Sequence, residues 1–308
     1  MGLDVPAAGA LGYRVRCACR STFIELPRLR YHVREWGSPG APLLFMLHGW
    51  MDVSASFQFL VDELGQDWHV VAPDWRGYGL SEWARQGCYW MPDYLADLEL
   101  LLDHFSAHDP VLIVGHSLGG NIGTLYAGVR PARVRALVNL EGLGLVGDAP
   151  GKAPARLAKW LDEMRTPPLL QDYANLDAVA ARLQKNNARL PDDRARFLAA
   201  NWARERKDGR YEILGDPAHK IVNPYLYRSE EVLAVWSAIC APVLWIMARE
   251  SPYAQKMDAL ADFGRRVASI SRVTRRWIDG AGHMMHHDEP RLLAQLIEEF
   301  LAPYRDLA

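Results

Sequence analysis

The residue best placed for nucleophilic chemistry is a serine between two glycines. Ser117 lies in a Gly-x-Ser-x-Gly motif with Gly115 and Gly119, after the apolar run from Val111 to Val114 and before an amphipathic helical pattern. Small residues are needed on such a strand-to-helix turn, which strains the serine backbone and exposes its hydroxyl. We therefore predict that Ser117 is a catalytic nucleophile. The simpler alternative is a serine that caps the helix at an ordinary turn.

A serine hydroxyl needs a general base, and the chain offers 10 histidines. His283 has the most suitable setting, because an alternating, strand-like run ends there in a glycine-rich loop ahead of the last helical pattern. His286 and His287 follow in the same loop and are the competing candidates. His116, beside the nucleophile, is expected to be structural, with its side chain leaving the turn on the side away from the substrate.

From Phe23 to Pro303 the sequence resembles the α/β-hydrolase superfamily. The motifs that carry the resemblance, besides the serine and the histidine, are His48-Gly49-Trp50 after an apolar run and the segment from Asp74 to Ser81. In that family, backbone N–H groups of the His-Gly-x loop and of the residue after the nucleophile stabilise the oxyanion. The resemblance thus implies donors at Trp50 and Leu118, and a structural turn from Asp74 to Ser81.

The acid of the triad departs from the common pattern of the family. The usual aspartate follows the strand that begins at Pro242, but this chain has Ser251 in that position. The haloalkane-dehalogenase-like branch carries its acid at the tip of the preceding strand, where this chain has Glu141. We predict that Glu141 is the acid. Glu250 is the alternative, one residue out of register, and a triad with another acid or none also stays open.

The nucleophile type limits the chemistry. Dehalogenases and epoxide hydrolases of the superfamily use an aspartate to attack a saturated carbon, whereas a serine suits acyl transfer at a carbonyl. We predict a hydrolase of carboxylic esters of small hydrophobic molecules that works through an acyl-enzyme. A C–C bond hydrolase or lyase on the same triad is the alternative, and a ligand-binding receptor is the third. The expected pocket walls are Trp50, Trp75, Trp160, Trp202, Tyr225, Tyr227, Met284 and Met285.

The elements that must position these residues alternate between strand and helix. Short apolar runs predict strands near 43–47, 70–72, 111–114, 136–140 and 243–247, with helical patterns between them. This order predicts a mostly parallel, doubly wound α/β sheet with its site at the carboxyl ends of the strands. From 148 to 232 about a third of the residues are charged and the apolar stripes are narrow. We predict a helical cap at 148–232, inserted in an α/β-hydrolase core domain formed by 1–147 and 233–308.

Composition excludes several classes of function. The formal net charge of −2 and the content of 11 Trp, 12 Tyr and 8 Phe argue against nucleic-acid binding, a membrane-surface protein and disorder. The apolar stretch from Val5 to Leu11 is short for a secretory signal, and the 4 cysteines, Cys88 among them, are scattered. We expect a cytoplasmic enzyme without cofactor or metal. His286, His287 and Asp288 are not expected to form a metal site, because adjacent histidines on one short loop rarely converge. The sequence does not distinguish a monomer from an oligomer.

Overall fold

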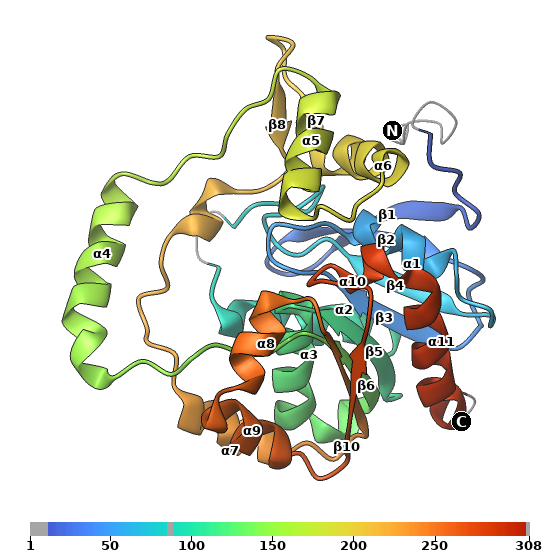
Figure 1. Cartoon of the computed structure of the whole chain (residues 1–308), viewed down its shortest axis with the longest axis vertical. Coiled ribbons are helices and arrows are strands. Elements are labelled where there is room, and N and C mark those ends of the chain that lie inside the picture. The colour runs from blue at the N-terminus through green and yellow to red at the C-terminus, as the bar shows by residue number, and fades with distance from the viewer. Residues whose placement is uncertain (1–11, 85–88, 306–308) are drawn as a thin grey trace.

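The computed structural model describes residues 12–84 and 89–305, so Val5–Leu11 and Cys88 lie outside the described residues. Its centre is an eight-stranded sheet with helices on both faces (Figure 1). The strand order is β1-β2-β4-β3-β5-β6-β9-β10, and β2 runs antiparallel to its two neighbours while the pairs from β4 to β10 are parallel. The strands are β1 (Cys19–Glu25), β2 (Arg30–Trp36), β3 (Leu43–Leu47), β4 (His69–Pro73), β5 (Val111–His116), β6 (Val134–Leu140), β9 (Val243–Ala248) and β10 (Val273–Ile278).

The central strands are apolar on both faces because helices cover both. In β5, Val111 and Ile113 join the hydrophobic core on one face of the sheet, and Leu112 and Val114 join the core on the other. All four side chains are buried. Continuous apolar runs are the expected pattern for such doubly covered strands. The predicted mostly parallel α/β sheet is therefore confirmed.

Two groups of helices form the outer layers. Side chains of α2, α3, α7, α8 and α9 pack in one core, and side chains of α1, α10 and α11 pack in the other. This arrangement leaves the carboxyl ends of the parallel strands free to carry loops. The helices are α1 (Gln58–Val61), α2 (Met91–Phe105), α3 (Leu118–Val129), α7 (Ser229–Ser237), α8 (Pro252–Asp258), α9 (Ala261–Ala268), α10 (Met285–Asp288) and α11 (Pro290–Leu301).

The antiparallel hairpin β1–β2 is absent from the sequence-based prediction. Strand β2 is almost wholly buried but carries polar side chains, which hide its apolar alternation. His32 Nδ1 lies 2.7 Å from Asp74 Oδ2, and Arg34 Nη2 donates to Asn201 Oδ1 at 2.8 Å. These polar residues are buried because each has a partner on another segment of the chain. Such partners are visible only in three dimensions.

The segment from Asp74 to Ser81 is a structural turn, as the resemblance implied. The Asp74 carboxylate accepts hydrogen bonds from the backbone N–H groups of Ser54 and Leu80 at 2.7 and 3.0 Å. The pKa of Asp74 is lowered: its burial acts to raise the pKa, but the charge of His32 and the hydrogen bond to it prevail. The turn thereby joins β4 to the loop after β3.

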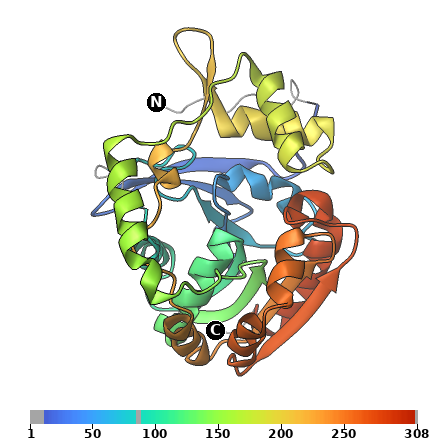
Figure 2. The same ribbon diagram turned by 60° about the vertical axis from the view of Figure 1, so that its left-hand side comes forward.

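The inserted segment contains more than the predicted helices. Figures 1 and 2 show α5, α6 and a two-stranded hairpin gathered beyond one end of the sheet, while α4 stands apart from them. The predicted cap boundary at residue 232 falls inside α7, whose Trp236 is buried in the core. The hairpin went unrecognised because its strands are three residues long. The cap elements are α4 (Ala153–Arg165), α5 (Leu176–Asn186), α6 (Asp192–Trp202), β7 (Ala203–Glu205) and β8 (Tyr211–Ile213).

Two further observations concern membranes and thiols. Across the described residues, no helix has both the length and the apolar character needed to cross a bilayer. Cys17, Cys19 and Cys240 are free cysteines.

A close backbone approach at Gly119 gives a stability prediction. A Cβ at position 119 would lie 2.0 Å from the carbonyl oxygen of Leu47, whereas a Cβ on helix α9 at position 264 would meet nothing within 4 Å. We expect Gly119→Ala to lower the free energy of unfolding by about 3 kcal/mol through overpacking. Gly264→Ala is the matched control and should raise it by up to about 1 kcal/mol. Urea unfolding measures both, and equal effects of the two substitutions would contradict the close approach.

Candidate active site

Ser117 lies on a strained turn between β5 and α3. Its backbone has φ 50° and ψ −110°, a conformation that residues other than glycine rarely adopt. Its N–H donates to the carbonyl oxygen of Leu140 at 2.8 Å, which anchors the turn to β6. A Cβ at Gly115 would lie 2.5 Å from the backbone oxygen of Gly119. The turn therefore has the geometry predicted from the motif, with the serine side chain on the cavity side.

Three side chains form an unbroken chain of hydrogen bonds. Ser117 Oγ lies 3.0 Å from His283 Nε2, and His283 Nδ1 lies 2.7 Å from Glu141 Oε2. The Glu141 side chain is fully buried, and the His283 side chain is 27% exposed. Because a carboxylate only accepts hydrogen bonds, Nδ1 carries the proton and Nε2 presents its lone pair to the serine hydroxyl. This is the tautomer that a general base needs.

The Glu141 carboxylate is held at the ends of two neighbouring strands. The backbone N–H of Glu141 donates to Ile246 O of β9 at 3.1 Å, and the Oε1 of its carboxylate accepts from the N–H of Ala248 at 2.8 Å. Ser251 Oγ donates to Oε2 at 2.7 Å. Position 251 is where the usual aspartate of the family would stand. The side chain there now binds the carboxylate that comes from β6.

Glu250, the alternative acid, lies elsewhere. Its carboxylate is exposed and forms an ion pair with Arg189, between α5 and α6. Its backbone N–H donates to Ala281 O at 3.2 Å. The structure thus brings Glu141, and not Glu250, to the imidazole of His283. Adjacent residues at a strand end point in different directions, so the side chain of Glu250 does not take the direction of Ser251, the position of the usual acid.

The residues that carry the two backbone donors implied by the resemblance lie close to the serine. Leu118 follows Ser117 in the chain, and a Cβ at Gly49, the neighbour of Trp50, would lie 3.4 Å from Ser117 Cβ. Within the described chain, the N–H groups of Trp50 and Leu118 donate to no other protein group. The loop that carries Trp50 is fixed by buried His48, which donates from Nδ1 to Gly49 O at 2.8 Å and accepts at Nε2 from the N–H of Trp75 at 2.8 Å. Burial lowers the pKa of His48, so this neutral arrangement is favoured.

His116 has the expected structural role, but its side chain does not turn away from the site, and that part of the expectation is wrong. Its Nε2 donates to the carbonyl oxygen of His283 at 2.8 Å, and its ring lies 4.8 Å from the ring of His283 and 4.4 Å from that of His286. Burial, with smaller contributions from His286 and His283, lowers the pKa of His116 well below its ordinary value. His116 is therefore a neutral group that holds the backbone of His283 in place.

A cavity of about 840 Å³ lies against Ser117 and His283. Three of the predicted wall residues line it: Trp50, Trp202 and Met284. Trp75 and Met285 are instead fully buried in the two cores. The other three predicted walls do not line it: Trp160, Tyr225 and Tyr227. Apolar walls that the sequence analysis missed are Leu143, Leu190, Leu198 and Ile213.

Other residues missed from the sequence support the loop of the base. Asp288 Oδ2 accepts from the N–H of Gly282 at 2.9 Å, and its Oδ1 accepts from Asn187 Nδ2 at 2.7 Å. The acidic residue shortly after the glycine-rich loop is the only sequence signal for this role. His286 and His287 both reach Ser56 Oγ, so the expectation that adjacent histidines do not converge is wrong.

A comparison with models of protein families shows to which family the chain belongs. Residues 42–290 match the model of the alpha/beta hydrolase fold family. The chain belongs to this family. The predicted superfamily, fold and general class, a hydrolase, are confirmed, while the roles of the individual site residues stay predictions.

Relatives of this α/β hydrolase have different stated activities. A "Serine hydrolase-like protein" of Danio rerio is 28% identical over 292 residues, which cover 87% of this chain and 84% of the relative. The "2-(acetamidomethylene)succinate hydrolase" of Mesorhizobium japonicum is 28% identical over 280 residues, 90% of this chain and 94% of the relative. The solved "Thioesterase Domain From Curacin Biosynthetic Pathway" superposes with a TM-score of 0.82 at 24% identity, covering 92% of this chain and 99% of the domain. At 24% identity, the likeness to this thioesterase domain shows a shared fold alone.

The depressed pKa of His116 predicts a pH dependence of stability. Its neutral form is favoured in the folded state, so its contribution is complete above the unfolded pKa of about 6.5 and is lost as the pH falls towards the lower folded pKa. We expect His116→Gln to make the decline in unfolding free energy between pH 6 and 5 shallower by up to about 1.4 kcal/mol per pH unit. Urea unfolding measures this slope. The exposed-residue control His108→Gln should keep the wild-type slope, and an unchanged slope in His116→Gln would contradict the assignment.

Proposed function

We propose that this chain is a cofactor-independent serine hydrolase that cleaves carboxylic esters of small hydrophobic molecules through an acyl-enzyme on Ser117. The observation that carries the proposal is the hydrogen-bonded sequence from Ser117 through His283 to buried Glu141, with distances of 3.0 and 2.7 Å. A nucleophile, a base within reach and a group that orients the base are the three requirements of this chemistry.

In the acylation step, Ser117 Oγ attacks the ester carbonyl while His283 Nε2 takes the hydroxyl proton. Glu141 keeps the proton on Nδ1 and stabilises the imidazolium that forms. The tetrahedral intermediate collapses when His283 donates its proton to the leaving alcohol, and the C–O bond to that alcohol breaks. Water, deprotonated by His283, then hydrolyses the acyl-enzyme and regenerates the serine hydroxyl.

Two backbone donors are available for the negative charge of each intermediate. Trp50 and Leu118, which carry these N–H groups, lie close to the serine, and Leu118 begins helix α3, whose N-terminal dipole also favours negative charge. Preorganised donors of this kind each stabilise a transition state by about 3 to 4 kcal/mol. This role suits a carbonyl substrate, whose oxygen becomes an oxyanion during the reaction.

The cavity supports a hydrophobic substrate. Its walls include Leu143, Leu198, Trp202 and Ile213, contributed by both the core and the cap, and basic residues line other parts of it. Apolar walls with few polar groups near the reacting atoms are typical of pockets that bind small organic ligands. A small-molecule substrate rather than nucleic acid or membrane, and the cytoplasmic location, remain predictions from the sequence.

The sequence also allows two other functions. The receptor hypothesis depended on the missing carboxylate at Ser251, and Glu141 bound to Ser251 removes that argument. A C–C bond hydrolase or lyase would use the same three residues, and the difference lies in the cap residues that position the leaving group. A protein with an intact triad that accumulates no acyl-enzyme from ester substrates would favour this second function.

The nucleophile and base can be tested together. We expect a fluorophosphonate to label Ser117, and we expect Ser117→Ala and His283→Ala each to abolish turnover of p-nitrophenyl esters, because each substitution removes a group that the proposed mechanism requires. Intact-mass and peptide analysis locates the label, and absorbance measures the turnover. A panel of acyl-chain lengths should show a preference for apolar acyl groups. Ester turnover that survives both substitutions would contradict the proposal.

The acid is tested by a matched pair of substitutions. Glu141→Gln should lower kcat by about 10³ to 10⁴, because a neutral amide no longer fixes the tautomer or stabilises imidazolium. Glu250→Gln removes an exposed carboxylate of the same type and should leave kcat near wild type. Steady-state kinetics on one ester with both proteins and the double variant distinguishes them. Near-wild-type kcat in Glu141→Gln would show that the acid is assigned wrongly.

A further inference from the structure

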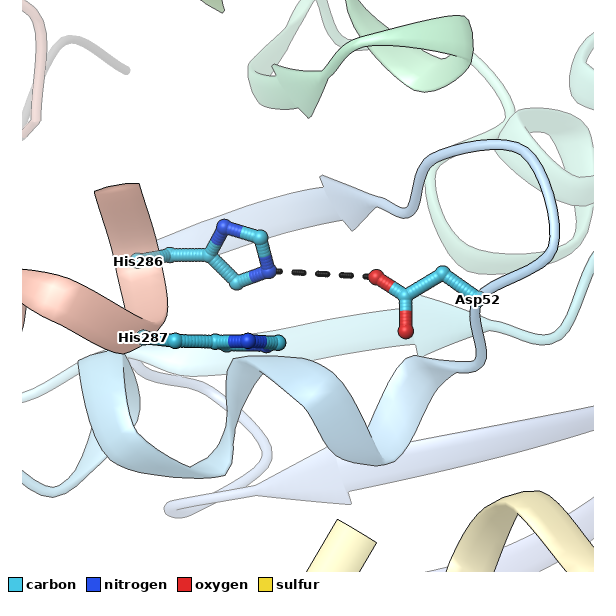
Figure 3. Close-up of side chains that lie close together, drawn as sticks. All are labelled: Asp52, His286 and His287. Atoms are coloured by element: carbon cyan, nitrogen blue, oxygen red, sulfur yellow. Dashed lines mark ion pairs between the residues drawn. The ribbon is translucent and has the colours of Figure 1, made fainter. Parts of the chain in front are cut away.

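A second cluster of ionisable side chains lies behind the catalytic histidine. His286 and His287 are consecutive residues of α10, and Asp52 faces them from the loop after β3 (Figure 3). All three are buried, with residue exposures of 0%, 3% and 8%. Their ligand atoms lie within 4.8 Å of one another, and this is the sole such group of three found among the described residues. The proposed mechanism uses none of them.

Ser56 occupies the middle of the cluster. Its Oγ lies 2.9 Å from His286 Nε2 and 2.5 Å from His287 Nε2. A hydroxyl has one proton, so it donates to one imidazole and accepts from the other. Both Nε2 atoms thus point at the same small volume, although the two residues are adjacent in the chain.

The carboxylate of Asp52 has one oxygen that accepts a hydrogen bond and one that does not. Its Oδ1 accepts from the N–H of Val53 at 2.9 Å, while buried Oδ2 has no hydrogen-bond partner and lies 3.8 Å from His286 Nε2. Buried polar atoms are normally paired, and each exception requires an explanation. A carboxylate oxygen without a donor beside two imidazole nitrogens is the donor set of a metal site.

We propose that Asp52, His286 and His287 bind a divalent transition-metal ion of the zinc type, and that this ion inhibits the enzyme. Two imidazoles and one carboxylate are common zinc ligands, and Ser56 Oγ or a water in the cavity completes four-coordination. Soft thiolate ligands are not part of the cluster, and oxygen atoms alone, which Mg²⁺ and Ca²⁺ prefer, are not available.

The distances and the access are compatible with such an ion. Tetrahedral zinc with ligands at about 2.0 to 2.2 Å places ligand atoms about 3.4 Å apart. His286 Nε2 and Asp52 Oδ2, at 3.8 Å, are already near this separation, so small side-chain rotations close the site. Asp52 and His287 also line the cavity beside Ser117, which gives the ion a route from solvent.

The site is coupled to the base through a short segment of chain. His286 follows His283 by three residues, and the ring of His116 packs on the rings of both while its Nε2 binds His283 O. When an ion draws the start of α10 towards Asp52, this packing moves the backbone of His283. A shift of about 1 Å in a catalytic group is enough to reduce turnover about 100-fold.

The binding test is made with Co²⁺ on the full chain, read as visible absorption of the four-coordinate ion and as bound metal after equilibrium dialysis. We expect one Co²⁺ per chain, displaced by Zn²⁺, in wild type and in His283→Ala, which removes binding to the catalytic histidine. Asp52→Asn keeps the acceptor for Val53, and His287→Gln keeps a polar side chain. Each should weaken binding at least 10-fold, while the surface control His108→Gln should bind as wild type does.

Binding of Co²⁺ by Asp52→Asn and His287→Gln with wild-type affinity, in proteins with wild-type circular dichroism, would overturn the site. Lack of stoichiometric binding to wild type would overturn it as well and would leave Asp52, Ser56 and the two histidines as a hydrogen-bonded network. The inhibition rests on the proposed ester hydrolysis: Zn²⁺ should inhibit wild type and should require at least 10-fold higher concentration in Asp52→Asn. Because the Co²⁺ measurement needs no turnover, failure of the esterase proposal and failure of the metal site are distinguishable.

Discussion

The hydrogen bond between His283 Nδ1 and the buried carboxylate of Glu141 is the interaction on which the site depends. It fixes which ring nitrogen carries the proton, and therefore whether Nε2 can accept the proton of Ser117. The carboxylate comes from the end of β6 and accepts hydrogen bonds from Ala248, the last residue of β9, and from Ser251 beyond it. Two neighbouring parallel strands thus share one acid, and the pairing of the strands sets its place.

Backbone strain is concentrated at the same edge of the sheet. Among the described residues, the non-glycine residues with positive φ are Met51, Ser117 and Glu141, and they follow β3, β5 and β6 in turn. Strain of this kind persists only where the surrounding structure determines the conformation. Here the ladder of parallel strands and the glycines at 115 and 119 provide that constraint. Met51, Ser117 and Glu141 are therefore brought together by adjacent strand ends.

The sequence predicted most of the core and the members of the site, and the reasons for its failures are physical. Apolar runs identified the doubly covered strands because both faces of these strands are buried. The hairpin β1–β2 was missed because His32 and Arg34 are buried with partners far away in the chain. Glu141 was predicted from the adjacency of two strand ends, whereas its bond to Ser251 depends on the loop conformation. The convergence of His286 and His287 on Ser56 likewise has no signal in local spacing.

The central claim is that the strained turn holds Ser117 Oγ between the imidazole of His283 and two free backbone donors. A crystal structure of the phosphonylated enzyme tests this most directly, because the phosphonyl group imitates the tetrahedral intermediate. The account predicts phosphorus bonded to Ser117 Oγ and one phosphonyl oxygen about 2.7 to 3.1 Å from the N–H groups of both Trp50 and Leu118. A phosphonyl oxygen that faces solvent or the side chain of another residue, with those two N–H groups unengaged, would contradict it.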